Sequence, residues 1–61
     1  MATHMAVVDE FHNERIHIAS LYNCPQHKIF IEEHQTVGEV CFYIDGQWIG
    51  YIDNDFYESM G

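Results

Sequence analysis

The chain has 61 residues, of which ten are acidic, two are lysine or arginine and five are histidine, for a formal net charge of −8. A chain of this length buries only about 60% of the surface that its unfolded form exposes, which leaves little room for an enclosed substrate pocket. Arg15 and Lys28 are the only fixed positive side chains, so direct binding to nucleic acid or to an anionic membrane is not expected. We therefore predict one domain over residues 1–61 that is not an enzyme.

Hydrophobic residues make up 48% of the chain and aromatic residues 15%, which is typical of a folded protein and not of a disordered one. No apolar run reaches the roughly 20 residues that span a bilayer, and no secretory signal pattern opens the chain. We expect a cytoplasmic protein in which Cys24 and Cys41 are reduced thiols. Residues 1–4 contain a His-Met pair of the kind that cloning leaves behind, so they are left out of the fold prediction.

The first expected element is a helix over residues 7–22, where apolar side chains recur at helical spacing along one broad arc. Pro25 disfavours helical geometry in the residue before it, so the helix should end just ahead of this proline. The alternation of Ile16 and Ile18 leaves a strand over residues 15–22 as the alternative. The members of the arc are Val7, Val8, Phe11, Ile18, Ala19, Leu21 and Tyr22.

Three strands are expected next, over residues 28–33, 39–44 and 47–52, because these runs are rich in β-branched and aromatic side chains. Asp45 and Gly46 lie between the last two runs and predict a type I′ turn, which needs positive φ at both central residues. The tail after the third strand should form a short helical turn or fray. The predicted fold is α+β, with one N-terminal helix packed on a three-stranded antiparallel β-meander.

The predicted turn also fixes which side chains share a face, because side chains alternate along a strand. Strict pairing from the turn places Tyr43 opposite Trp48, and the next pairs are Phe42–Ile49, Cys41–Gly50 and Val40–Tyr51. One helix can cover only one face of the sheet. The other face is then either a minor core, covered by Phe56 and Tyr57 of the tail, or an exposed patch that binds a partner or a second copy. The predicted patch consists of Cys41, Tyr43, Trp48 and Ile52, and the predicted core face of Val40, Phe42, Ile44, Ile49 and Tyr51.

Six acidic residues are expected at one end of the meander, where the first and third strands end and the second begins. Like charges on neighbouring strands are destabilising, so such a cluster needs an explanation. It either keeps the protein soluble and the sheet edge unpaired, or it imitates a row of phosphates toward a basic partner. The six are Glu32, Glu33, Glu39, Asp53, Asp55 and Glu58.

A zinc-stabilised mini-domain is one further interpretation, because two thiols and two imidazoles could close a tetrahedral site. The spacing of Cys24, His27, His34 and Cys41 matches no standard zinc pattern, however. No glycine-rich phosphate loop or recognisable catalytic arrangement is present either. We predict no catalytic residue, no metal site and no cofactor.

In size and charge alone, the chain resembles the small acidic inhibitors that phages and mobile elements encode, including anti-restriction proteins, anti-CRISPR proteins and other DNA mimics. This resemblance rests on composition, involves no motif and assigns no residue. The leading hypothesis is a binding protein that occupies the basic, nucleic-acid-binding surface of a partner protein. The six acids would replace phosphates, with Tyr43 and Trp48 as anchors. The alternative is an assembly module that forms a homodimer through the predicted patch.

Overall fold

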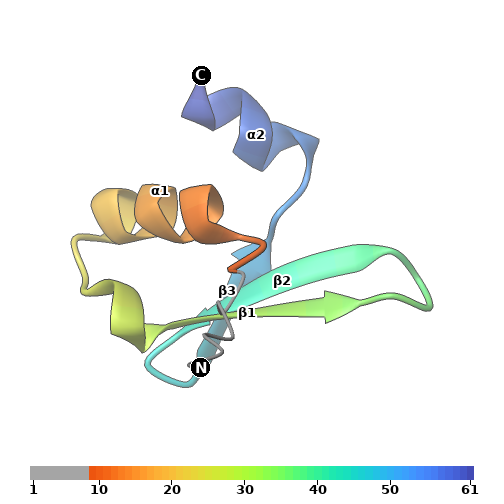
Figure 1. Cartoon of the computed structure of the whole chain (residues 1–61), viewed down its shortest axis with the longest axis horizontal. Helices are drawn as coiled ribbons and strands as arrows, with labels where there is room; N and C mark the ends of the chain where they lie inside the picture. Colours follow the sequence, from red (N-terminus) through yellow and green to blue (C-terminus); the bar gives the residue numbers. More distant parts are fainter. Residues whose placement is uncertain (1–8) are drawn as a thin grey trace, which may run out of the picture.

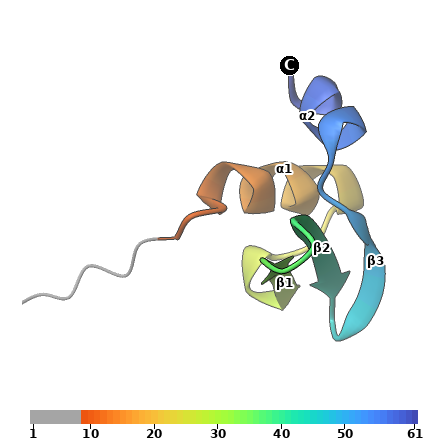
Figure 2. The same cartoon turned by 90° about the vertical axis from the view of Figure 1, so that its right-hand side faces the viewer.

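The computed structural model describes residues 9–61. The strands form one antiparallel sheet in the order β1-β2-β3, and both helices of the described residues lie on the same side of it (Figure 1 and Figure 2). The predicted α+β class is confirmed, and the tail, for which a short helical turn or fraying was expected, forms a second helix. In chain order the elements are α1 (His12–Tyr22), the 3-10 helix η1 (Gln26–Lys28), β1 (Ile29–His34), β2 (Glu39–Ile44), β3 (Gln47–Tyr51) and α2 (Asn54–Met60).

Helix α1 confirms the helical interpretation of this segment over the strand, although Val7 and Val8 of the predicted arc lie outside the described residues. Asn23 ends the helix with a φ of 52°, a left-handed conformation that asparagine tolerates well. Ile18 is the buried residue of α1. Leu21 was placed in the apolar arc but is 58% exposed, because only a narrow stripe of this short helix faces the sheet.

The turn between β2 and β3 has the predicted type I′ geometry, with φ of 54° at Asp45 and 82° at Gly46. Next to it, Tyr43 pairs with Trp48 as expected. Farther along, an irregularity between Phe42 and Tyr43 shifts the register of β3 by one residue. The predicted pairs Phe42–Ile49, Cys41–Gly50 and Val40–Tyr51 are therefore wrong.

The shift is a β-bulge at Ile49, which has no partner on β2. Beyond the bulge, Phe42 pairs with Gly50 and Cys41 pairs with Tyr51. A one-residue shift sends every following side chain to the opposite face of the sheet. Tyr51 consequently moves to the face of Trp48, whereas Ile52 joins the core and is buried. The predicted faces had these two residues exchanged.

The core lies between the helices and the sheet, around the buried side chains of Ile18, Ile29, Phe42 and Ile52. Phe56 of α2 packs against it, with its ring 6.3 Å from that of Phe42. The tail therefore covers the helix side of the sheet, and the predicted minor core under Phe56 and Tyr57 does not form.

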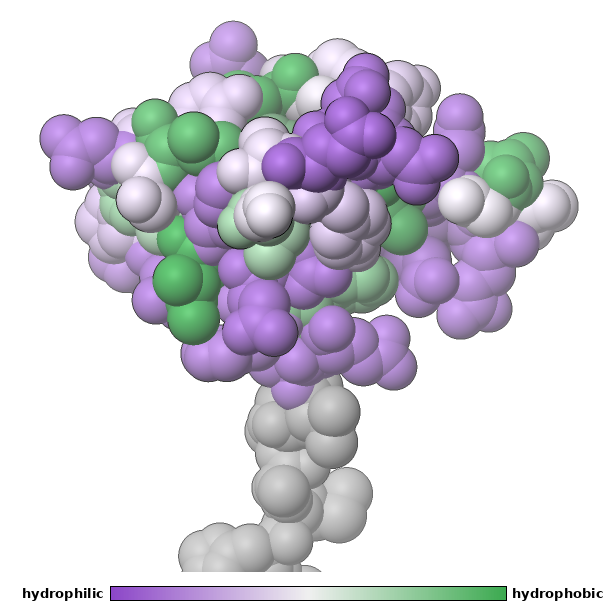
Figure 3. Space-filling view, turned by 90° about the horizontal axis from the view of Figure 1, so that it is seen from above, coloured by the Kyte–Doolittle hydropathy of each residue, from purple (hydrophilic) through white to green (hydrophobic). Residues whose placement is uncertain are grey.

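Helix α2 also contacts α1 directly. The Tyr57 hydroxyl donates a hydrogen bond to the Glu14 carboxylate at 2.8 Å, and this bond raises the pKa of Tyr57. His17 and Ser59 lie within hydrogen-bonding distance, at 3.1 Å. On this helix side, hydrophilic residues surround separate apolar groups (Figure 3). Neither helix of residues 9–61 has the length and apolar character that crossing a membrane would require.

Candidate functional site

The sheet face that points away from the helices, termed the outer face, carries four aromatic side chains. Phe30 of β1 pairs with Tyr43 of β2, which pairs in turn with Trp48 of β3, and the bulge brings Tyr51 to the same face. Ring centroids are 5.7 Å apart for Phe30 and Tyr43 and 5.3 Å apart for Trp48 and Tyr51. We call these four residues the aromatic strip, which crosses all three strands.

The aromatic strip is largely open to solvent. Phe30 is 59% exposed, Tyr51 50% and Trp48 48%. Both described helices lie on the opposite side of the sheet (Figure 2). Contiguous exposed aromatic surface of this kind marks interaction sites, because tryptophan and tyrosine bury much area at little entropic cost.

Beside the strip, the Glu32 carboxylate is the centre of a polar cluster on the outer face. The Tyr43 hydroxyl donates a hydrogen bond to Glu32 Oε1 at 3.0 Å, and His34 Nε2 lies 3.1 Å from the same oxygen. The Cys41 thiol lies 3.9 Å from it, in a residue that is only 3% exposed. The hydrogen bond to Glu32, together with partial desolvation, raises the pKa of Tyr43 because the carboxylate disfavours the phenolate.

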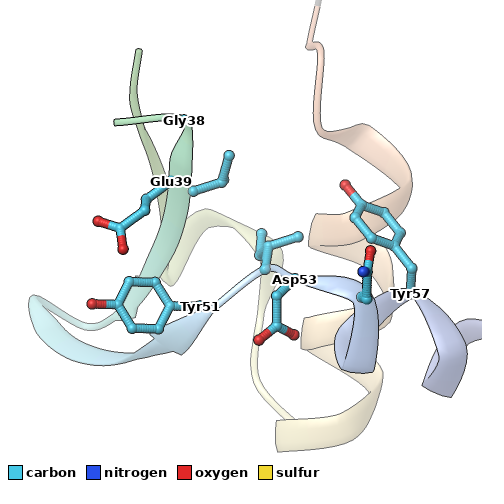
Figure 4. Close-up of a pocket in the computed structure, with 8 residues that line it drawn as sticks. Gly38, Glu39, Tyr51, Asp53 and Tyr57 are labelled. Carbon is cyan, nitrogen blue, oxygen red and sulfur yellow. The ribbon is translucent and has the colours of Figure 1, made fainter. Parts of the chain in front are cut away.

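At the end of the sheet near α2, an open pocket of about 450 Å³ includes two of the predicted acids, Glu39 and Asp53. Figure 4 shows Glu39 beside Tyr51, with Asp53 at the junction of β3 and α2. Asp53 also has a structural role, because its carboxylate accepts a hydrogen bond from the Phe56 N–H at 3.1 Å and caps α2. The pocket is lined by Gly38, Glu39, Val40, Tyr51, Ile52, Asp53, Asn54 and Tyr57.

The six predicted acids are divided among different surfaces of the molecule. Glu32 and Glu39 belong to the outer face, whereas the pairing of Glu33 with Val40 places it on the helix-covered face, at its exposed margin. Asp53 caps α2, and the exposed residues Asp55 and Glu58 lie within that helix. Of the predicted contact residues, Glu32, Tyr43 and Trp48 lie close together on the outer face.

The two basic side chains lie away from this surface. Arg15 of α1 forms an ion pair with Asp9, and its guanidinium lowers the pKa of that carboxyl. Lys28 lies at the opposite end of the sheet from Glu39, where its carbonyl accepts a hydrogen bond from the Asp45 N–H. Glu32 and Glu39 therefore have neither of these cations beside them.

The four residues of the alternative zinc interpretation do not come together. Cys24 packs against the core on the helix side of the sheet, whereas Cys41 lies on the outer face, and both thiols are free. His34 and Cys41 do lie close together, but their third neighbour is Glu32. The interpretation with Cys24 and His27 is therefore wrong.

Sequence reasoning missed Phe30 and Tyr51 as members of the aromatic strip. The position of Phe30 on the outer face follows from the pairing of β1 with β2. That register can be assigned only when the length of the connecting loop is known. Tyr51 requires the bulge, whose one signal in the sequence is Gly50, a glycine inside an otherwise apolar strand.

The family model described as Bacteriophage T4 protein Y11B matches residues 2–61. Neither the curated proteins nor the solved structures gave a match.

Proposed function

The chain belongs to the Bacteriophage T4 protein Y11B family and is thus a phage protein, and we propose that it is a non-enzymatic inhibitor of a basic partner protein. In this proposal the outer face of the sheet binds the nucleic-acid-binding surface of that partner and excludes its nucleic acid. The observation that carries the proposal is the aromatic strip, which no element of residues 9–61 covers. It lies next to Glu32 and Glu39, which have neither Arg15 nor Lys28 beside them, in a chain of net charge −8.

The acidic charge and the aromatic strip would contribute differently to binding. Long-range attraction to a basic surface can speed association by about 10–10³-fold at low ionic strength, and salt screens it. Buried aromatic anchors chiefly slow dissociation, because their contacts form only in the docked complex. Trp48 and Tyr51 are the proposed anchors, whereas Glu39 belongs to the steering charge.

The distribution of acids over several surfaces favours a partner that contacts the domain on more than one side. Nucleic-acid-binding surfaces combine positive charge along the phosphate path with sites on which bases stack. A protein that offers carboxylates beside exposed aromatic rings matches both properties. The −8 charge also opposes binding of the protein to nucleic acid itself.

The proposal is tested by capture from a lysate of the phage's host at low salt, with the immobilised full chain and elution by a salt gradient. We expect a basic nucleic-acid-binding protein that salt releases and that added DNA or RNA displaces. Trp48→Ala should abolish capture. Glu39→Lys should weaken it more than Glu33→Lys, a matched charge reversal at an exposed strand position on the other face.

Three results would contradict the proposal. Capture that survives Trp48→Ala would exclude the aromatic strip as the anchor. Equal loss with both lysine variants would show that only total charge matters. Retention of no basic protein would end the proposal, and a concentration-dependent dimer in sedimentation, broken by Trp48→Ala, would then identify the strip as a self-association surface.

A further inference from the structure

The outer face contains a second arrangement beside the aromatic strip, formed by three potential metal ligands. Glu32, His34 and Cys41 each direct one potential metal-ligand atom toward the others, and these three atoms all lie within 4.8 Å of one another. The Glu32 oxygen is 3.1 Å from His34 Nε2 and 3.9 Å from Cys41 Sγ. We propose that these three residues bind one divalent transition-metal ion of the zinc class.

Regular strand geometry, and not a flexible loop, holds the three ligands together. Glu32 and His34 are two residues apart on β1, so alternation places both on the outer face. Cys41 of the neighbouring strand β2 is the direct register partner of Glu32. The backbone of the site is therefore already in place before an ion arrives, which lowers the entropic cost of binding.

The observed spacing is close to that of a zinc coordination sphere. Zinc bonds of about 2.0–2.3 Å at tetrahedral angles place neighbouring ligand atoms roughly 3.3–3.7 Å apart. The two measured separations, 3.1 and 3.9 Å, lie on either side of that range. Small side-chain rotations would complete the sphere, and three protein ligands leave one position for water.

The ligand types determine the class of ion. A thiolate and an imidazole favour zinc and similar transition metals over magnesium and calcium, which prefer an all-oxygen set. When the ion binds, a metal–sulfur bond forms and the Cys41 thiol releases its proton to solvent. The Tyr43 hydroxyl, which donates to Glu32, would orient the carboxylate as an outer-shell partner.

The experiment titrates the reduced, metal-free full chain with Co²⁺ and then displaces it with Zn²⁺. A 1:1 complex should show the near-ultraviolet thiolate-to-cobalt charge-transfer band, which zinc abolishes. Every protein carries His4→Ala, so that the N-terminal segment supplies no imidazole. Cys41→Ser should remove the band while Cys24→Ser, the matched thiol control, retains it.

The two imidazoles offer a second matched pair, which remains informative if Cys41→Ser fails to fold. His34→Ala should weaken binding by more than the roughly 10–100-fold that loss of an outer-shell partner costs. His27→Ala should leave the affinity unchanged. No 1:1 complex, a band that survives without the Cys41 thiol, or equal effects of the two histidine variants would each overturn the proposal.

Discussion

The two faces of the sheet divide the apolar residues of the chain by kind. The helix-covered face holds Ile29, Phe42 and Ile52, which form the core together with Ile18 of α1, whereas the outer face holds four aromatic rings and a carboxylate. Two short helices suffice to cover one face of a three-stranded sheet, and in residues 9–61 no element remains for the other. In residues 9–61 the packed core thus lies on one face of the sheet, and the other face remains open for the binding that we propose.

A phenylalanine lies on each face, so the loss of stability on truncation to alanine can be compared directly between the two faces. Phe42→Ala should cost about 3–5 kcal/mol, because it leaves a cavity in the core. That loss is comparable to the roughly 3–9 kcal/mol expected for a whole domain of this size, so we expect an unfolded or barely folded protein. Phe30→Ala, at an exposed position, should cost about 1 kcal/mol or less.

Urea denaturation followed by far-ultraviolet circular dichroism measures both variants. Equal midpoints for Phe42→Ala and Phe30→Ala would mean that the outer face is also a core in solution. That result would remove the basis for treating the aromatic strip as a binding surface.

Ile52 and Tyr51 are neighbours at the end of β3 that lie on opposite faces of the sheet, and their substitution tests the bulge in the same way. Ile52→Ala should cost about 2–5 kcal/mol, because the side chain is buried in the core. Tyr51→Ala should cost about 1 kcal/mol or less, because half of its surface is exposed. Thermal unfolding of the two variants measures the difference, and the opposite order would indicate the unbulged register.

Substitutions of Asp53, the N-cap of α2, separate the effect of helix capping from the effect of negative charge. Asp53→Ala removes the acceptor of the Phe56 N–H and should cost about 0.5–2 kcal/mol, with faster amide exchange at Phe56. Asp53→Asn keeps a good capping side chain without the charge, so its stability should stay near that of the parent. Loss of partner capture with both variants would assign Asp53 to the interface as well.

The smallest expected effect is a change in titration on the outer face. Because the pKa of Tyr43 is raised in the folded protein, its bond to Glu32 contributes stability below the ordinary tyrosine pKa of about 10. That contribution is lost as pH rises through the folded pKa. Glu32→Gln should return the pKa of Tyr43 toward its ordinary value, which NMR of the labelled ring can follow.

Tyr57 serves as the control for that titration, because its raised pKa depends on Glu14 and not on Glu32. The Tyr57 resonance should titrate identically in the parent and in Glu32→Gln. An unchanged Tyr43 titration in the variant would show that the Tyr43–Glu32 hydrogen bond is absent in solution.

The sequence allowed prediction of those parts of the fold that local chemistry dictates. Asp45 and Gly46 supply the positive φ values of the hairpin turn, and the approach of Pro25 indicates where α1 stops. Strand positions followed from the β-branched and aromatic runs, with boundaries that differ by one residue at β1 and β3. These features depend on neighbours a few residues apart.

The remaining features depend on contacts between distant residues. The bulge at Ile49 allows Ile52 to be buried in the core that α1 helps to form, and the hairpin sequence alone does not contain this contribution. Helix α2 is stable because Phe56 packs on the core, whereas its seven residues would be marginal in isolation. The Glu32, His34 and Cys41 cluster likewise requires the pairing of β1 with β2 across a loop of unknown geometry.

The bulge also has a consequence for the order of folding. The turn and the first two residue pairs of the hairpin are the same in the bulged and the unbulged register, so an isolated hairpin has two nearly equivalent ways to close. Burial of Ile52 in the core, together with Ile18 of α1 and Phe56 of α2, favours the bulged register. We therefore expect Tyr51 to take its place on the outer face only after the core has formed.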